Sequence, residues 1–225
     1  MPQPKDSGDI AGSWSILYAA RRQLLKRYPT VWDIPIRKKH TDVIADELSS
    51  GMKVLEIGSS DSGLRHFLES RFEGVEYRSM DVDRQTTQDY YSLDEIDEKF
   101  DAILFFEVIE HMPFAEGMPM LGRIYDLLKP AGLLIMTTPN VAHPTHYYRD
   151  PTHVTPYSHE GLGGMLVSLG FEVKGMYRIY NAPFIQKVFR MYIAALVHRY
   201  IGVDFTHSLL VVARRRARDR PGTRE

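Results

Sequence analysis

The chain of 225 residues contains no cysteine, which excludes disulfide bonds, thiolate nucleophiles and zinc–thiolate sites. It also lacks any run of about 18 apolar residues, and its first ten residues lack the basic and apolar parts of a signal peptide. A formal net charge of -1 leaves no excess of one sign, which argues against a strongly electrostatic nucleic-acid binder. We therefore expect a cytoplasmic protein without a transmembrane segment that acts on a small molecule.

Length and composition limit the architecture. A chain of 225 residues is long enough for one α/β domain of about 150 to 200 residues with additional elements. With 44% hydrophobic and 25% charged residues, the composition is that of an ordinary globular protein. We expect an N-terminal tail and lid helix over 1–38, with 1–12 disordered, a main domain over 39–214, and a basic, flexible tail over 215–225.

The dinucleotide fingerprint G-x-G-x-x-G is absent as well, which disfavours an NAD or FAD site. The segment VLEIGSSDSG (54–63) nevertheless joins an apolar strand to a tight turn at Gly58, and helical spacing follows over 64–72. A carboxylate such as Glu56 would repel a pyrophosphate bound at the helix N-terminus. It would attract S-adenosylmethionine, which has no phosphate and carries a sulfonium and an ammonium group.

Strand and helix patterns alternate along the rest of the chain. We expect helices at 13–26, 39–48, 64–72, 117–128, 159–169 and 183–200. We expect strands at 54–57, 75–80, 100–106, 133–138, 171–179 and 208–213. This order predicts an α/β fold with a doubly wound, mostly parallel sheet, which binds ligands at the carboxyl ends of its strands. Asp81 lies at such an end, where a carboxylate can accept two ribose hydroxyls.

Three segments together resemble the class I S-adenosylmethionine-dependent methyltransferases. The turn LLKPAG with LLIMTTPN (127–140) is similar to the family's post-core signature, and FDAILFFEVIEHM (100–112) is similar to its fourth-strand motif. VLEIGSSDSG resembles its motif I, with Ser60 and Ser62 in place of two glycines. The resemblance covers roughly 39–214. It implies a Rossmann-like methyltransferase fold with a seven-stranded sheet, N-terminal helices, and a last strand that runs antiparallel beside the sixth.

The same resemblance implies a set of residues that bind S-adenosylmethionine. In that family an Asp of the loop before the fourth strand accepts from the adenine amine, which matches Asp89 in Gln88-Asp89-Tyr90; an ordinary surface turn would explain this tripeptide equally well. The predicted cofactor residues are Glu56, Gly58, Ser60, Asp81, Val82, Asp89, Tyr90 and Phe106.

Glu107, Glu110 and His111 form the pattern E-x-x-E-H at the end of the strand expected at 100–106. A helical turn there would place both carboxylates on one face. Two carboxylates and an imidazole that face one cleft form either a divalent-metal site or a hydrogen-bonded polar cluster. The histidine-rich stretch that follows the next strand, 143–158, belongs to the same rim, because the carboxyl ends of parallel strands share an edge.

E-x-x-E-H with a downstream histidine resembles two methyltransferase groups, the ubiquinone-pathway O-methyltransferases and the enzymes that methylate the terminal 2′-hydroxyl of small RNAs. The resemblance implies that Glu107, Glu110, His111 and His153 bind Mg²⁺ or another divalent metal. A metal lowers the pKa of a bound hydroxyl and orients it for attack on the sulfonium methyl. Alternatively, His111 or His153 is a general base beside Glu107, or only a structural hydrogen bonder.

Acceptor contacts are expected from the loop after the strand at 133–138, because long polar loops at strand ends build substrate sites. The predicted residues are His143, His146, Tyr148 and Arg149, although loop exposure alone would also explain Tyr148 and Arg149. The aromatic residues of the first 38 positions, Trp14, Tyr18, Tyr28 and Trp32, form either a lid or part of the core.

The helix expected at 183–200 is amphipathic, with Lys187 and Arg190 among Phe184, Phe189 and Ile193. It suits a lid or a homodimer contact, or a lipid surface.

These patterns favour an S-adenosylmethionine-dependent O-methyltransferase that acts on a hydroxylated small molecule or a sugar-like acceptor, with or without a divalent metal. Terminal 2′-O-methylation of RNA is an alternative in the same fold, which the near-neutral charge disfavours. An NAD-dependent oxidoreductase is the alternative from a different class.

Overall fold

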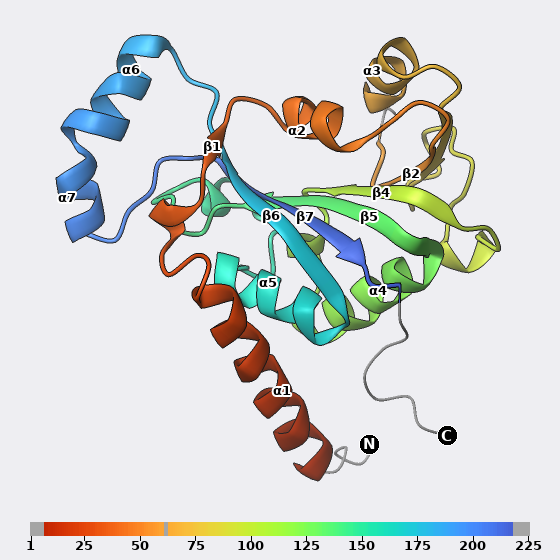
Figure 1. Cartoon of the computed structure of the whole chain (residues 1–225), viewed down its shortest axis with the longest axis horizontal. Helices are drawn as coiled ribbons and strands as arrows, with labels where there is room; N and C mark the ends of the chain where they lie inside the picture. The colour runs from red at the N-terminus through yellow and green to blue at the C-terminus, as the bar shows by residue number, and fades with distance from the viewer. Residues whose placement is uncertain (1–6, 61–62, 218–225) are drawn as a thin grey trace.

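A twisted seven-stranded sheet forms the centre of the molecule in the computed structural model, which describes residues 7–60 and 63–217 (Figure 1). The strands are β1 (Ile36–Arg37), β2 (Lys53–Ile57), β3 (Glu76–Met80), β4 (Phe100–Phe106), β5 (Leu128–Pro139), β6 (Phe171–Ile179) and β7 (Ser208–Arg215). They lie in the order β1-β6-β7-β5-β4-β2-β3, and β7 runs antiparallel to β5 and β6 while the other pairs are parallel. The predicted α/β fold with a mostly parallel sheet and an antiparallel last strand is therefore confirmed.

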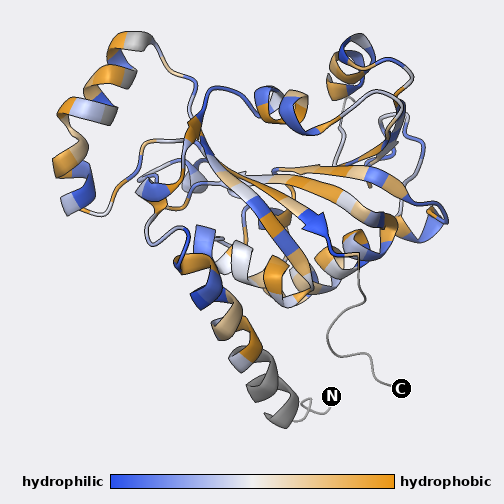
Figure 2. Ribbon diagram, viewed as in Figure 1, coloured by the Kyte–Doolittle hydropathy of each residue, from blue (hydrophilic) through white to orange (hydrophobic). Residues whose placement is uncertain are grey.

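Helices cover both faces of this sheet because its central strands are apolar on both sides. The helices are α1 (Ser7–Leu25), α2 (His40–Glu47), α3 (Gly63–Arg71), α4 (Phe114–Leu127), α5 (His159–Ser168), α6 (Phe184–Val188) and α7 (Ala195–Tyr200). In β4, Ile103 and Phe105 pack in the core that contains α1, α4 and α5, whereas Ala102 and Leu104 pack in the core that contains α2 and α3. This alternation follows from the two-residue period of a strand. Apolar colour accordingly runs along the central strands in Figure 2.

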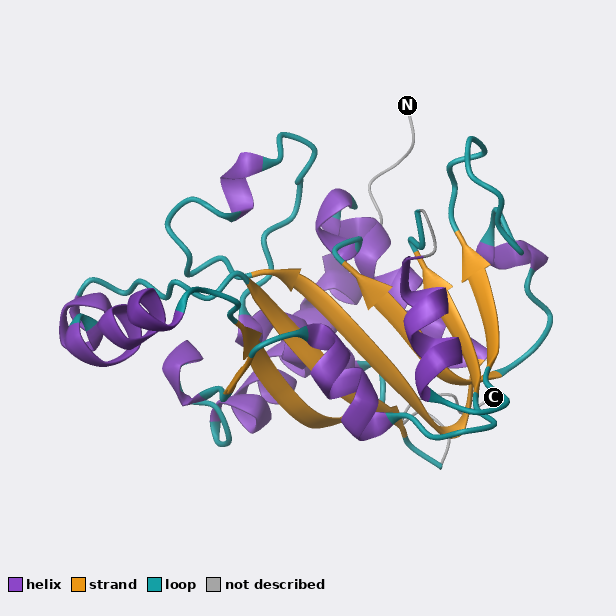
Figure 3. Cartoon of the chain, turned by 90° about the horizontal axis from the view of Figure 1, so that it is seen from above, coloured by secondary structure: helices purple, strands orange, loops and turns teal. Residues whose placement is uncertain are grey.

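The sheet also determines where a site can form. β2, β3, β4 and β5 are parallel, so their carboxyl ends share one edge. Long loops lie beyond the arrowheads at that edge (Figure 3). Open α/β sheets bind ligands at this edge, since the helix N-termini and the loop side chains converge there.

Three expectations about the elements were wrong. Residues 7–12 belong to α1 rather than to a disordered tail. The helix expected over 183–200 is interrupted by a π-helical turn, η5 (Phe189–Ile193), in which the amide of Ala194 donates to the carbonyl of Phe189. The short edge strand β1 was not expected; it pairs with β6 and lies in the region assigned to the N-terminal tail and lid.

Outside these regions the expected helices and strands are present, and only their ends differ. The proposed boundaries at 38/39 and 214/215 stay predictions. Within the described residues, none of the helices has the length and apolar character that a transmembrane span requires.

α1 lies directly against α5, and two glycines of α5 make that approach possible. An ideal Cβ at Gly163 would lie 2.3 Å from Cδ2 of Leu24, and one at Gly164 would lie 2.5 Å from Cγ of Arg21. Leu24 and Tyr28 are buried in the core, and the hydroxyl of Tyr28 accepts from the amide of Met176. The end of α1 and the residues that follow it, with Leu24 and Tyr28, are thus part of the core.

We predict that Gly163→Ala lowers the free energy of unfolding by about 1–3 kcal/mol, because the added methyl collides with Leu24. Alanine in a helix interior would otherwise stabilise by about 1 kcal/mol relative to glycine. In the background of Leu24→Ala the same substitution should therefore become neutral or stabilising. Urea denaturation of the four proteins of this double-mutant cycle measures the coupling, and additive effects would contradict the contact.

Candidate active site

The turn after β2 is built around two residues with positive φ. Gly58 has φ +77°, and a Cβ at this position would lie 2.3 Å from Cγ2 of Val108, so only glycine fits. Ser60 has φ +45°, and its amide donates to Oδ2 of Asp81 over 2.9 Å. The other carboxylate oxygen of Asp81 accepts from the amide of Asp83. Asp81 therefore links the ends of β2 and β3. Ser62, the second predicted serine replacement, lies outside the described residues.

Gln88 joins the loop after β3 to the same turn, a role that the sequence did not predict. Its side-chain oxygen accepts from the hydroxyl of Ser59 over 2.6 Å, and its Nε2 donates to the carbonyl of Ser60 over 2.8 Å. Gln88 and Ser59 are both buried. An amide side chain can serve as donor and acceptor at once, which suits it to bridge two loop segments.

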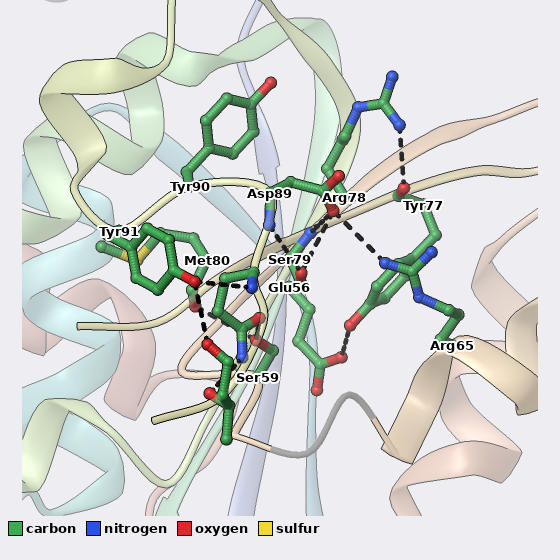
Figure 4. A network of polar contacts seen from close by, with 12 residues as sticks. Glu56, Ser59, Arg65, Tyr77, Arg78, Ser79, Met80, Asp89, Tyr90 and Tyr91 are labelled. Atoms are coloured by element: carbon green, nitrogen blue, oxygen red, sulfur yellow. Dashed lines mark hydrogen bonds and ion pairs between the residues drawn. The ribbon is translucent and has the colours of Figure 1, made fainter. Parts of the chain in front are cut away.

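Glu56 and Phe106 line a cavity of about 580 Å³ at the carboxyl ends of β2, β4 and β5. The carboxylate of Glu56 accepts from the hydroxyl of Tyr77, which holds it in one orientation (Figure 4). The volume of the cavity lies within the range of small-molecule and cofactor sites. The complete lining consists of His40, Glu56, Ser59, Gly63, Leu64, Phe106, Glu107, Thr137, His146, Ile179 and Ser208.

Of three other predicted cofactor residues, two are hydrogen-bonded within the protein and one is exposed. Asp89 accepts from the amide of Ser79 over 2.9 Å and from its hydroxyl over 3.2 Å. The hydroxyl of Tyr90 donates to Glu98, and burial together with this carboxylate raises the pKa of Tyr90 to about 12. Figure 4 shows Tyr90 directed away from Glu56. Val82 is 77% exposed beside this loop. Their contacts with adenosine stay predictions.

Glu107 occupies a strained position where β4 ends. Its φ is +51°, which is uncommon for a residue other than glycine and occurs most often at functional sites. Its amide donates to the carbonyl of Thr137 in β5, and its side chain lines the cavity. Burial raises the pKa of Glu107, while hydrogen bonds with Thr137 and Ser208 oppose this shift.

Glu110 lies in the short helix η3 (Ile109–His111) and is completely buried. Neither oxygen of its carboxyl group makes a well-formed hydrogen bond within residues 7–60 and 63–217, although Thr138 and Glu107 lie beside it. Burial and the nearby charge of Glu107 raise the pKa of Glu110 to about 8. Burying a carboxyl group without a hydrogen-bond partner is costly, and a cation bound beside it would offset that cost.

His153 is fixed by a hydrogen bond that also determines its tautomer. Its Nδ1 lies 2.7 Å from the carbonyl oxygen of Tyr147, which can only accept. Nδ1 therefore carries the proton, and Nε2 of the neutral ring has a free lone pair. The carbonyl of Glu110 accepts from the amides of Val154 and Thr155, which binds the loop with His153 to η3.

His111 is oriented by a similar relay. Its Nδ1 lies 2.9 Å from the hydroxyl oxygen of Thr152, and that hydroxyl donates its hydrogen to Asp150 over 2.6 Å. Hydrogen bonds with Thr152 lower the pKa of Asp150, so Asp150 is an ionised acceptor. Thr152 must then accept from Nδ1–H of His111, which again leaves Nε2 with its lone pair. Histidine ligands of metals are commonly oriented in this way by an outer hydrogen-bond partner.

Three of the four predicted metal ligands come together in the folded chain. Among the described residues, ligand atoms of Glu110, His111 and His153 all lie within 4.8 Å of one another. The rings of His111 and His153 have their centroids 4.8 Å apart. Glu107, the fourth predicted ligand, is outside this group and lines the cavity beside it. The predicted helical turn begins only at Ile109, so it does not include Glu107.

The predicted acceptor residues do not share one environment. His146 lines the 580 Å³ cavity. His143 is buried, and its Nδ1 accepts from the amides of Thr145 and His146. Tyr148 is 80% exposed, and Arg149 lines a second cavity. His40, Ser59, Thr137 and Ser208 line the main cavity but were not predicted. Ser59 and Thr137 lay in recognised motifs, at 54–63 and 127–140, whereas His40 and Ser208 belong to no functional pattern of the sequence.

The sheet order, the turn after β2 and the cavity at the strand ends define a class of proteins, the class I S-adenosylmethionine-dependent methyltransferases. The chain belongs to the methyltransferase domain family, which it matches over residues 31–174. S-adenosylmethionine is the cofactor of this family. The chain therefore contains a methyltransferase domain, which disfavours the NAD-dependent oxidoreductase alternative.

Individual relatives are more distant. A ubiquinone biosynthesis O-methyltransferase of Ruegeria pomeroyi is 33% identical over 107 residues, which are 47% of this chain and only 36% of that relative. A crystal structure of a SAM-dependent methyltransferase from Archaeoglobus fulgidus has a TM-score of 0.62 at 16% identity and covers 78% of this chain and 94% of that one. The cyclopropane synthase MmaA2 of Mycobacterium tuberculosis has a TM-score of 0.55 at 15% identity, and the match covers 78% of this chain and 82% of the synthase. These likenesses establish the fold and leave the acceptor open.

We predict that Glu56→Gln weakens binding of S-adenosylmethionine by tenfold or more, because it removes a buried negative charge from the cavity lining. Isothermal titration calorimetry measures the affinity. Glu69→Gln, on the exposed side of α3, is the matched control and should bind as the wild type does. Equal affinities for both variants would exclude Glu56 from the cofactor site.

Because the histidines near the cavity have lowered pKa values, we predict that the free energy of unfolding decreases in acid. Burial lowers the pKa of His143 to about 4 and also lowers the pKa values of His146 and His207. An unfolded histidine has a pKa of about 6.5, so the unfolded chain binds more protons below this pH. The contribution of His143 is fully present above pH 6.5 and falls progressively toward pH 4, by about 2–3 kcal/mol.

His143→Asn tests this contribution, because the amide oxygen can replace Nδ1 as acceptor for the two loop amides and does not titrate. Urea denaturation at pH 7.5 and pH 5 should show a smaller loss of stability in the variant than in the wild type. Parallel pH profiles for the two proteins would show that His143 does not titrate in this way.

Proposed function

We propose that this protein transfers a methyl group from S-adenosylmethionine to a hydroxyl oxygen of a small-molecule acceptor. The observation that carries the proposal is the buried, unpartnered carboxyl group of Glu110 beside two histidines with free Nε2 lone pairs. Oxygen acceptors need help to lose a proton, and such a group can supply it. The printed name of the Ruegeria relative, an O-methyltransferase, supports the same chemistry.

The cofactor residues act through charge and shape. S-adenosylmethionine carries positive charge, and Glu56 supplies a carboxylate to the cavity in which we place it. Asp81 accepts from the amide of Ser60 and Gln88 bridges Ser59 and Ser60, so the turn is rigid before the ligand binds. A preorganised turn reduces the entropy that binding must overcome.

Glu110, His111 and His153 fit a divalent metal, and we infer that they hold one. The set offers a carboxylate and two imidazoles, and the two imidazoles are oriented by Thr152 and by the carbonyl of Tyr147. A metal bound there would lower the pKa of an acceptor hydroxyl and hold it in place. Its charge would also satisfy the carboxyl group of Glu110, which is otherwise buried without a partner.

Glu107 lies where the metal group meets the cofactor cavity. Its left-handed backbone and its contacts with Thr137 and Ser208 place the carboxyl group in the cavity lining. We assign it the role of hydrogen-bonding the acceptor, with His146 at the same cavity. Holding the acceptor oxygen in line with the methyl group and the sulfur supplies much of the rate acceleration, since the sulfonium is already a good leaving group.

A titration with Mn²⁺, monitored by electron paramagnetic resonance, tests directly whether a metal binds. We predict that Glu110→Gln abolishes this binding, and that Thr152→Val weakens it about tenfold because His111 loses its outer partner. Affinity for S-adenosylhomocysteine should stay unchanged in both variants. The matched control is Glu116→Gln, an exposed carboxylate in the first turn of α4.

Activity distinguishes the metal from a general base. In a methyl-transfer assay with hydroxylated acceptors, EDTA and Glu110→Gln should each reduce kcat by about a hundredfold or more, and added Mg²⁺ should restore only the EDTA-treated wild type. Activity that survives both treatments would reject the metal. His111 or His153 would then be the general base.

A further inference from the structure

A second cavity, of about 380 Å³, lies next to the methyl-transfer cavity and is lined by cationic and neutral polar groups. Its lining consists of His143, Pro144, Thr145, Arg149, Asn181, Ala182, Pro183, Gln186, Arg190, Phe205 and His207. No acidic residue of the described chain is among them. A cavity with two arginines and no carboxylate has a positive potential.

The two arginines are not neutralised by ion pairs. Neither Arg149 nor Arg190 lies within 4.0 Å of a carboxylate among the residues that the structure describes. Arg190 stacks its guanidinium on the ring of Phe205 at 4.6 Å and donates to the hydroxyl of Tyr180 over 3.3 Å. These contacts orient the guanidinium without compensating its charge.

The pKa of His207, a histidine of this lining, is consistent with a positive potential in the second cavity. Burial lowers the pKa of His207, and the charges of Arg149 and Arg190 lower it further. The geometry agrees for His143, whose Nδ1 accepts two backbone hydrogen bonds and therefore carries no proton. The two guanidinium groups supply the charge of this cavity.

The two cavities share a wall. His146 lines the methyl-transfer cavity and stacks on His207, with ring centroids 5.3 Å apart and an interplanar angle of 27°. Next in the chain, Ser208 lines the methyl-transfer cavity while His207 lines the second one. The two cavities therefore lie on either side of this pair of histidine rings.

We propose that the second cavity binds an anionic group of the methyl acceptor, a phosphate or a carboxylate, through Arg149 and Arg190. This inference rests on the proposed function, because it names the class of acceptor. Planar guanidinium groups pair with phosphate or carboxylate oxygens through two parallel hydrogen bonds. Gln186 and Asn181 supply further amide donors in the same lining. The acceptor class is thus a hydroxylated organic acid or phosphate ester.

Calorimetric titration of the full-length protein with inorganic phosphate, and separately with acetate, tests the site at low ionic strength. We expect phosphate, acetate or both to bind more tightly than chloride, and the tighter anion identifies the group. Arg149→Gln and Arg190→Gln should each weaken this binding at least about tenfold, since each removes a charge-assisted pair of hydrogen bonds. Arg149→Lys, which retains the charge but not the fork, should lose less.

Arg22→Gln, on the exposed surface of α1, is the matched control for the loss of one positive charge. Binding of either anion no tighter than that of chloride would overturn the proposal. So would equal weakening by Arg22→Gln and Arg149→Gln, because it would indicate a general charge effect.

Titration of the same variants with S-adenosylhomocysteine and Mn²⁺ separates this inference from the proposed function. If the anion site fails, wild-type cofactor and metal affinities still support methyl transfer. If the proposed function fails, affinity for S-adenosylhomocysteine is absent while the anion still binds.

Discussion

The backbone reversal at the end of β4 is the constraint on which the rest of the site depends. Glu107 adopts a left-handed conformation there, and its amide donates to the carbonyl of Thr137 at the end of β5. The chain then enters η3, which carries Glu110 into the interior. The carbonyl of Glu110 accepts two amides of the loop that begins after β5, and this contact brings His153 to the same place. One strained residue thus joins the cofactor cavity to the polar cluster.

Charge is divided along the edge of the sheet. Two carboxyl groups, those of Glu56 and Glu107, line the cavity of about 580 Å³, whereas Arg149 and Arg190 line the adjacent one without a carboxylate partner in the described residues. His143, His146 and His207 lie between these groups, and burial lowers the pKa of each. Such a division suits a cationic methyl donor on one side and an acidic acceptor on the other.

Local patterns predicted the motifs, but they did not predict which side-chain atoms of the motifs are already hydrogen-bonded within the protein. Asp81 and Asp89 stand where the sequence placed them, yet one accepts from the amide of Ser60 and the other from that of Ser79. These contacts cross between strands, so no spacing along the chain encodes them. His40 and Ser208 line the cavity for a similar reason, since α2 and β7 reach it only through the order of the sheet. The π-helical interruption after α6 also escaped prediction, because apolar spacing does not distinguish π from α turns.

By itself, the sequence determined the fold class, the antiparallel last strand beside the sixth that follows from the family resemblance, and the identity of the E-x-x-E-H and downstream histidine residues. These depend on apolar periodicity and short motifs, which are local properties of the chain. Only the tertiary structure decided which ligands converge, which tautomers His111 and His153 adopt, and where two unpaired arginines meet. Convergence, tautomer and pairing depend on neighbours that are distant in the chain, and folding alone brings these neighbours within hydrogen-bonding distance.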